Sequence, residues 1–289
     1  MFDLFSHFRP HYAVLATFLG AAALAARAYP AALALAAVAL LNGWAVRDLW
    51  LGGGSAAAAA GGAPLRVVSV NVLDSNPTPG KVLDFVRGSD ADLVVLVDAK
   101  SERWRGVLAA LGDLYPHRAP DSWREGAPVI LLSRRPLPVE TVVRPAVGAD
   151  RPYVVARLAA PRATPLVVGV HPASPSPTEA EDSRERDHQL DHIGATVEGV
   201  AGPVIVAGDF NATPWSPHLR DLLAATDLRD AGAGQGWLPT WPVRLGPAGI
   251  PIDHVLVRGE VAVTGLRRGP DVGSDHYPLI ADLRIVGPS

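Results

Sequence analysis

Short apolar runs recur along the chain, and several of them stop at a residue that can hold a metal ion or a phosphate. The clearest run, Val204 to Ala207, continues through Gly208 into Asp209, Phe210 and Asn211. Apolar runs of four to eight residues bounded by polar or turn residues are typical of buried strands. We therefore predict strands over residues 65–72, 93–97, 129–132, 153–158, 166–170, 204–207, 254–257 and 279–285.

Apolar residues at helical spacing lie between several of these runs. The pattern predicts helices over residues 81–88, 102–111, 179–200 and 219–225, the third of them with many charges on one side. Strands and helices alternate in the first part of this region, and strands follow strands elsewhere. This order predicts an α/β protein with mixed sheets and disfavours a purely parallel sheet.

The first 50 residues have a different pattern, because Arg27 is the only charged residue between His11 and Arg47. The uncharged stretches 12–26 and 28–46 approach the roughly 20 residues that cross a bilayer as a helix. Pro30 suits the first turn of a second helix. We predict a transmembrane helical hairpin in residues 1–50. A single span over 28–46, a cleaved signal peptide and an alanine-rich soluble helix are the alternatives.

A linker separates this hairpin from the rest. Residues 51–64 contain Gly-Gly-Gly-Ser, five alanines and Gly-Gly-Ala-Pro, which supply flexibility and few side chains for a core. The predicted organisation is a membrane anchor over 1–50, a linker over 51–64 and one globular domain over 65–289.

Composition and charge narrow the chemistry. The chain has no cysteine, which excludes disulfides and a thiolate metal site. Its formal net charge is −3 and its pI is about 6.3, so it lacks the basic footprint of a protein that grips long nucleic acid. A small or lipid-linked phosphate is a more compatible ligand. Because polar groups are costly inside a core, their repetition at run ends predicts one shared site where strands emerge.

Three short motifs sharpen this prediction when they are taken in order. Gly208-Asp209-Phe210-Asn211, Ile252-Asp253-His254 and Ser274-Asp275-His276 follow Asn71 and a carboxylate at position 98. As a set, from residue 65 to about 286, they resemble the endonuclease/exonuclease/phosphatase superfamily. The resemblance implies a four-layer α/β sandwich with two packed mixed β-sheets, and hydrolysis of phosphoester bonds that depends on Mg²⁺ or Mn²⁺.

The same resemblance implies a role for each motif residue. Asn71, Asp98 and Asp275 match metal-site positions. Asp209 matches the residue that orients or deprotonates the attacking water, and Asn211 the residue that holds the phosphate or that water. His276 matches a donor to a phosphoryl oxygen or a general base. His171 matches the histidine that stabilises the transition state or protonates the leaving group, and Asp253 the carboxylate that orients that histidine.

Position 98 departs from the family pattern, which has glutamate after glutamine where this chain has Val97-Asp98. Aspartate is shorter by about 1.5 Å, so metal coordination through water or a shifted backbone is expected, and a helix-capping role is the alternative. Other candidates lie beside the motifs. Arg151 is a further candidate for a phosphate contact, and His254 should point away by strand alternation. Three tryptophans form either a substrate rim or buried packing: Trp215, Trp237 and Trp241.

The anchor followed by a linker resembles a bacterial branch of the superfamily that includes teicoplanin-resistance-type proteins. That resemblance implies a cell-membrane protein with its catalytic domain outside the cytoplasm and a phosphate or diphosphate on a lipid carrier, or another phosphorylated small molecule, as substrate. An endonuclease or exonuclease is the enzymatic alternative. A catalytically inactive, membrane-tethered binding module is the alternative of another class, and retention of the motif residues argues against it.

Overall fold

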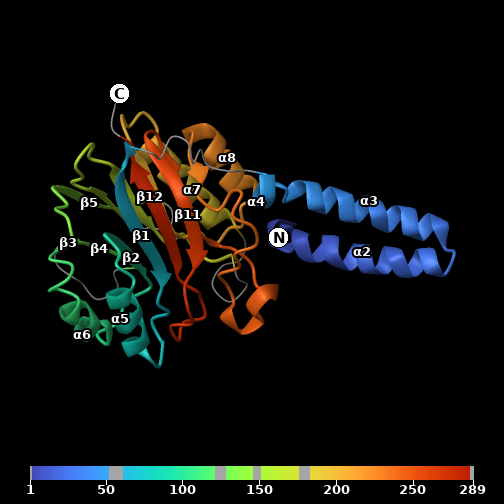
Figure 1. Cartoon of the computed structure of the whole chain (residues 1–289), viewed down its shortest axis with the longest axis horizontal. Helices are drawn as coiled ribbons and strands as arrows, with labels where there is room; N and C mark the ends of the chain where they lie inside the picture. The colour runs from blue at the N-terminus through green and yellow to red at the C-terminus, as the bar shows by residue number, and fades with distance from the viewer. Residues whose placement is uncertain (1, 52–60, 121–127, 146–150, 176–182, 287–289) are drawn as a thin grey trace.

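The computed structural model describes residues 2–51, 61–120, 128–145, 151–175 and 183–286. They form an α/β sandwich with a helical hairpin attached to it (Figure 1). The first sheet has the order β11-β12-β1-β2-β4-β3, formed by Val261–Arg268, Leu279–Ile285, Ala63–Asn71, Leu93–Val97, Val129–Ser133 and His117–Ala119. The second sheet has the order β5-β6-β7-β8-β10-β9, formed by Val139–Val143, Tyr153–Arg157, Leu166–Val170, Val204–Asp209, Asp253–Arg258 and Arg229–Asp230.

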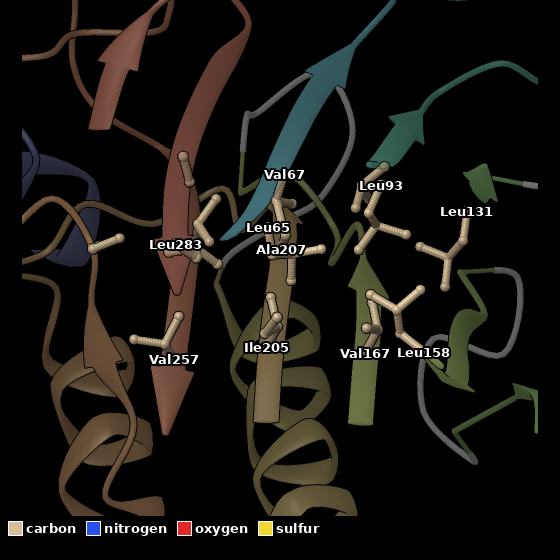
Figure 2. Packing of buried hydrophobic residues seen from close by; sticks show 14 of the residues in the cluster. Leu65, Val67, Leu93, Leu131, Leu158, Val167, Ile205, Ala207, Val257 and Leu283 are labelled. Carbon is tan, nitrogen blue, oxygen red and sulfur yellow. The ribbon is translucent and has the colours of Figure 1, made fainter. Parts of the chain in front are cut away.

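The main core lies between the two sheets, where alternate residues of each strand face inward. Leu65 and Val67 of β1 meet Val167 and Ile205 of the second sheet in one buried cluster (Figure 2). Gly169 marks how closely the sheets approach, because an added Cβ would lie 2.7 Å from Cγ1 of Val129. A strand side chain every second residue therefore supplies this core, as the period of two requires.

The outer faces of both sheets are covered by helices. Helices α5 (Pro79–Gly88) and α6 (Trp104–Ala110) pack on the first sheet, where they share a cluster with Val68 and Val70 of β1. Helices α7 (Arg184–Val197) and α8 (Pro217–Thr226) pack on the second. The result is the expected order of helix, sheet, sheet and helix, and it confirms the prediction of an α/β fold with two packed mixed sheets.

Most predicted elements of the domain are present within two or three residues of their expected bounds. The expected helix over 179–200 is described from Arg184, since residues 176–182 lie outside the described part. Four strands were not expected: β3, β5, β9 and β11. All four are edge strands, where the apolar signal is weak. In β11 the alternation also breaks at a register shift between Val263 and Gly265.

The N-terminal region forms the expected hairpin, with α2 (Arg9–Ala25) and α3 (Tyr29–Ala45) side by side and short helices α1 (Phe2–Ser6) and α4 (Asp48–Leu51) at its base (Figure 1). No helix among the described residues is long and apolar enough to cross a membrane. The prediction of transmembrane spans is therefore not supported, although the hairpin itself is present. Both helices have 17 residues, about 26 Å each at 1.5 Å per residue.

The expected linker is only partly visible. Residues 52–60 lie outside the described part, Leu51 ends α4, and β1 already begins at Ala63, two residues before the predicted domain start. Ala63 and Pro64 pair with Ile285 and Arg284 of β12, so the end of the predicted linker belongs to the first sheet.

Candidate active site

Strand topology brings the predicted site residues to one edge of the sandwich. Parallel strands β1 and β2 end at Asn71 and next to Asp98, and parallel strands β7 and β8 end next to His171 and at Asp209. Carboxyl ends of parallel neighbours lie at the same edge of a sheet. The antiparallel strand β10 begins at that edge, with Asp253 opposite Asp209. The chain before β12 reaches the same edge, because Leu279 pairs with Ser69 of β1.

A cavity of about 650 Å³ opens at this edge. Seven of the eight predicted site residues line it: Asn71, Asp98, His171, Asp209, Asn211, Asp275 and His276. The eighth, Asp253, lies behind His276 and reaches the cavity through it. The fold thus brings the whole predicted set together.

Asp209 occupies the centre of the polar wall and is buried. Its Oδ2 accepts a hydrogen bond from Nδ2 of Asn71 at 2.9 Å, and its Oδ1 accepts one from the backbone N–H of Asn211 at 2.9 Å. Burial raises the pKa of the carboxyl group to about 7, against the opposing charge of His276. A carboxylate with a pKa near neutrality suits the role of a proton acceptor.

His276 is the neighbouring charged group. Its Nδ1 lies 2.9 Å from Oδ2 of Asp253, a carboxylate acceptor, so Nδ1 donates. Burial acts to lower the pKa of His276, but the Asp253, Asp209 and Asp275 carboxylates outweigh it and raise the pKa to about 9. The imidazole is therefore protonated at neutral pH, with Nε2 3.6 Å from Oδ2 of Asp209.

This pairing corrects one prediction. Asp253 was expected to orient His171, yet its hydrogen bond goes to His276. The register of β10 explains the change, since Asp253 lies opposite Asp209 at the edge that the segment preceding β12 also reaches.

His171 has the opposite protonation state. Burial lowers its pKa to about 3, against the charge of Asp98, and the positive charges of Arg151, Lys100 and His276 act in the same direction as burial. Its Nε2 lies 3.7 Å from Oδ2 of Asp209. The cavity thus presents a neutral imidazole and an imidazolium on either side of one carboxylate.

The Gly-Asp-Phe-Asn motif depends on backbone geometry. Gly208 has φ of +150°, and a Cβ at this position would lie 2.0 Å from the carbonyl oxygen of Val170 on β7. Glycine is therefore required for β8 to stay paired with β7. Asn211 has φ of +49°, and its Nδ2 donates to the carbonyl of Pro172 at 3.1 Å, which aims the amide into the cavity wall.

The backbone of Asn211 is held by Arg186, which sequence reasoning missed. Arg186 lies on α7 and is completely buried; its Nη1 donates to the carbonyl oxygen of Asn211 at 3.0 Å, and its Nε donates to Oδ1 of Asp187 at 3.0 Å. The charged residues of α7 indicate a solvated helix face. Nothing in their spacing along the sequence distinguishes Arg186 and Asp187 from their exposed neighbours. Arg186 is a positioning residue for the Asn211 loop.

The oxygen atoms expected to hold a metal fit a hard divalent cation. Asn71, Asp98 and Asp275 all line the cavity, and each is oriented: Oδ1 of Asn71 accepts from the N–H of Leu73, Oδ2 of Asp98 from that of Asp74, and Oδ2 of Asp275 from Nε1 of Trp241. Carboxylate and amide oxygens are the ligands that Mg²⁺ prefers.

Asp98 remains ionised although it is partly buried. Burial acts to raise its pKa, but the ammonium of Lys100, 2.6 Å from Oδ1, together with the Asp74 N–H, lowers it. Asp98 also has φ of +65°. Lys100 was not expected to line the site; its only sequence signal is its place two residues after the strand-end carboxylate.

A tighter cluster lies beside this set. Ligand atoms of Asp209, Asp253 and His276 all lie within 4.8 Å of one another. The hydrogen bond between His276 and Asp253 joins two of the three, so we interpret this cluster as a proton-holding group next to the oxygen ligands.

The remaining candidates divide between the cavity and its surroundings. Arg151 and Trp241 line the cavity, whereas Trp215 and Trp237 stack on each other nearby, with ring centroids 6.1 Å apart. His254 points away as strand alternation predicts, with its ring nitrogens 2.8 Å from Oδ2 of Asp230 and 2.8 Å from the carbonyl oxygen of Ala212.

Known proteins match both the sequence and the fold. Two Vibrio cholerae proteins named UPF0294 protein are 32% identical over 111 residues, and the matched part spans 36% of this chain and 36% of theirs. The chain thus spans about a third of the length of these relatives.

Three solved structures share the fold. An endonuclease/exonuclease/phosphatase from Beutenbergia cavernae has a TM-score of 0.61 with 22% identity, covering 77% of this chain and 72% of that one. Sphingomyelinase C from Streptomyces griseocarneus has a TM-score of 0.58 with 23% identity, covering 76% and 99%. A Staphylococcus aureus beta toxin variant with bound magnesium ions has a TM-score of 0.56 with 19% identity, covering 76% and 99%.

The family model described as Endonuclease/Exonuclease/phosphatase family matches residues 68–276. This range contains all eight predicted site residues and both sheets' central strands. The chain therefore belongs to the endonuclease/exonuclease/phosphatase family.

Proposed function

We propose that this protein is a metal-dependent phosphoesterase that hydrolyses a phosphate or diphosphate ester. Members of its family are hydrolases that act on phosphoester bonds. The observation that carries the proposal is the geometry of the cavity, where buried Oδ2 of Asp209 lies 3.6 Å from Nε2 of His276 and 3.7 Å from Nε2 of His171, in the cavity that the predicted metal ligands also line. The pKa values of Asp209 and His276, about 7 and about 9, support it. General acid and base groups with separated pKa values are the mark of such sites.

Asn71, Asp98 and Asp275 would hold Mg²⁺ or Mn²⁺. The magnesium ions in the beta toxin of the same fold support this assignment. When bound, such a cation would withdraw negative charge from a phosphoryl oxygen. Backbone and indole N–H groups already orient the side chains of Asn71, Asp98 and Asp275, which reduces the reorganisation that metal binding requires.

The remaining residues act on the phosphate and the attacking water. Asp209 accepts a proton from water, and protonated His276 donates a hydrogen bond from Nε2 to a phosphoryl oxygen. His171 donates a hydrogen bond to the negative charge that develops on the phosphate or on the leaving group. Asn211 lines the same wall and holds the phosphate, while Lys100 and Arg151 attract the anion into the cavity.

We further propose that the hairpin places this site at a lipid surface, at the cell membrane with the catalytic domain outside the cytoplasm. The exposed apolar side chains of the hairpin support this proposed lipid contact, since Leu33 is 74% and Leu40 73% exposed to solvent. Exposed apolar surface of this kind is typical of a membrane or protein contact. A lipid-linked phosphate is then the substrate class, and the acidic net charge disfavours long nucleic acid.

Hydrolysis by the full-length protein in detergent tests the reaction, measured as phosphate release from the lipid phosphates and the nucleotide and as strand cleavage for DNA. The panel contains a lipid diphosphate, a lipid phosphate, a nucleotide and DNA, each with Mg²⁺ or with EDTA. We expect turnover of the lipid phosphates with Mg²⁺ and none in EDTA. Turnover of DNA alone would assign a nuclease, full activity in EDTA would overturn the mechanism, and no turnover of any substrate would favour a binding module.

A further inference from the structure

The N-terminal segment does more than lead into the hairpin, because it forms part of the active-site cavity. Leu4, His7 and Phe8 line the same cavity as Asp209 and His276. Leu4 lies in α1, and His7 and Phe8 are the two residues between α1 and α2, more than 60 residues before the first motif residue, Asn71. A segment expected only to anchor the chain thus meets the residues that carry the chemistry.

Contacts with the domain hold this segment in place. Nε1 of Trp215 donates to the carbonyl oxygen of Ser6 at 2.7 Å, and Nε2 of His11 lies 2.9 Å from the carbonyl oxygen of Ala248. The His11 ring also contacts the edge of Trp237, with centroids 6.1 Å apart. Leu4 and Phe8 therefore have a defined position relative to the site.

The other end of the hairpin is fixed to the same surface. Val46 and Leu49, at the end of α3 and in α4, are buried in a cluster with Trp215. The Arg220 side chain donates to the carbonyl oxygen of Ala45. Because both ends of the hairpin contact the domain at its base, the hairpin and the cavity form one unit (Figure 1).

The cavity lining combines polar and apolar groups. Its polar part, here called the polar wall, consists of carboxylates, amides and histidines, and apolar side chains complete the lining: Leu4, Phe8, Leu73, Pro175, Ile250 and Ile252. Phe8 is 38% exposed, so it remains available to a ligand. An anion bound at the polar wall has an apolar surface beside it.

That apolar surface continues outward along the hairpin. Helix α2 starts at Arg9, directly after Phe8, and exposes Val14, Leu15 and Phe18 to solvent. A soluble, fully polar phosphoester would leave Phe8 and Leu4 in contact with water. An amphiphile covers them with its apolar part and meets His276 with its phosphate.

We propose that Leu4 and Phe8 are specificity-determining residues that select phosphoesters carrying an apolar chain next to the phosphate. This inference rests on the proposed phosphoesterase function and goes beyond it, because it assigns the chain's own N-terminal residues to substrate recognition. The hairpin base then receives the apolar chain while Asp209 and His276 act on the phosphate.

The test compares two soluble phosphodiesters, p-nitrophenyl octyl phosphate and p-nitrophenyl methyl phosphate, both below their critical micelle concentrations. In each, water attacks phosphorus, the bond to the nitrophenolate oxygen breaks, and alkyl phosphate, nitrophenolate and protons are the products. Full-length protein is assayed with Mg²⁺ at one fixed detergent concentration. We expect the octyl ester to have a kcat/KM on the order of 10- to 100-fold above that of the methyl ester.

Substitutions test whether Leu4 and Phe8 cause the preference for the octyl ester. Leu4→Ala/Phe8→Ala should reduce the octyl-to-methyl ratio to within about threefold of one, since the contact to the apolar chain is lost. Phe8→Leu should retain most of the ratio. The matched control, Leu24→Ala/Leu41→Ala, removes exposed apolar side chains outside the cavity and should leave the ratio unchanged.

Binding separates the two proposals. The affinities of octyl phosphate and methyl phosphate are measured with Mg²⁺ by calorimetry on the same proteins. A binding preference for octyl phosphate that the double variant abolishes supports the apolar wall, even if neither ester is hydrolysed and the proposed reaction fails. Hydrolysis of both esters at equal rates, or an octyl-to-methyl ratio that is unchanged in Leu4→Ala/Phe8→Ala, would refute the role of Leu4 and Phe8 in substrate selection. The proposed phosphoesterase function would not be affected.

Discussion

The active site and the helical hairpin have opposite relations between polarity and burial. Asp209 is 1% and His276 5% exposed, although both are ionisable, whereas Leu33 and Leu40 on the hairpin are more than 70% exposed. The domain stabilises its buried polar groups through hydrogen bonds with one another. The hairpin has no comparable cover for its apolar residues among the described parts of the chain.

This difference indicates where each region obtains its function. Pairing inside a buried polar cluster shifts pKa values and prepares chemistry. Exposed apolar surface prepares contact with another apolar body. The two regions meet at Leu4 and Phe8, where an apolar segment closes a polar cavity.

The largest expected effect concerns the buried polar cluster. Asp209→Ala and His276→Ala should each lower turnover by on the order of 10² to 10⁴, the usual contribution of a general base or a charge stabiliser. Steady-state kinetics on a soluble phosphodiester measures this loss. His188→Ala, an exposed position on α7, serves as the control and should change turnover little. Equal losses in all three variants would refute the assigned roles.

The next effect concerns the support of the site. Arg186→Met should destabilise the fold by about 3–5 kcal/mol, because Asp187 and the carbonyl of Asn211 lose their buried partner. Denaturant unfolding measures the change. Arg184→Met, on an exposed part of the same helix, should stay within about 1 kcal/mol of the parent protein. A similar loss in both variants would mean that Arg186 has no special structural role.

Variants of Asp98 test the predicted metal site. Asp98→Asn should raise the Mg²⁺ concentration required for half-maximal activity by on the order of tenfold, since it removes a ligand charge. Asp98→Glu restores the longer side chain typical of the family and should preserve or tighten the requirement. Titration of activity and of metal binding measures both. An unchanged requirement in Asp98→Asn would remove this residue from the metal site.

The pH dependence tests the pairing of His276 with Asp253. The Asp253 carboxylate helps to raise the pKa of His276 to about 9, so activity that needs the imidazolium should fall as pH rises through that value. Asp253→Asn removes this charge and should lower the pKa, which moves the alkaline limb of the kcat/KM profile to lower pH by about one unit or more. A limb that stays in place would show that another group titrates there.

The smallest effect on chemistry is expected from the hairpin. Leu33→Gln/Leu40→Gln should weaken binding to lipid vesicles by a few-fold to about tenfold, because apolar side chains no longer leave water. Turnover of a soluble phosphodiester should stay within about twofold. Vesicle sedimentation and kinetics measure the two quantities. Unchanged sedimentation would indicate that a protein partner, not lipid, covers this surface. Deleting residues 1–64 is a poorer test, since it also removes Leu4 and Phe8.

Much of the fold followed from local patterns. The buried strands β1, β2, β7 and β8 are continuous apolar runs, and such runs are recognisable without knowledge of their partners. The edge strands were missed because their sequences are weakly apolar and their stability comes from pairing with a neighbouring strand. The hairpin was expected from its composition, but its helices are too short to support the predicted spans.

The candidate site was predictable in its membership and not in its connections. The amino-acid sequence by itself determined which strands are buried and which polar residues end them, since both depend on neighbours along the chain. Only the tertiary structure decided that Asp253 pairs with His276, that Arg186 is buried against Asn211, that His171 is neutral while His276 is charged, and that Leu4 and Phe8 close the cavity. Register, burial and through-space charge decide these features, and they arise between residues that are far apart in the chain.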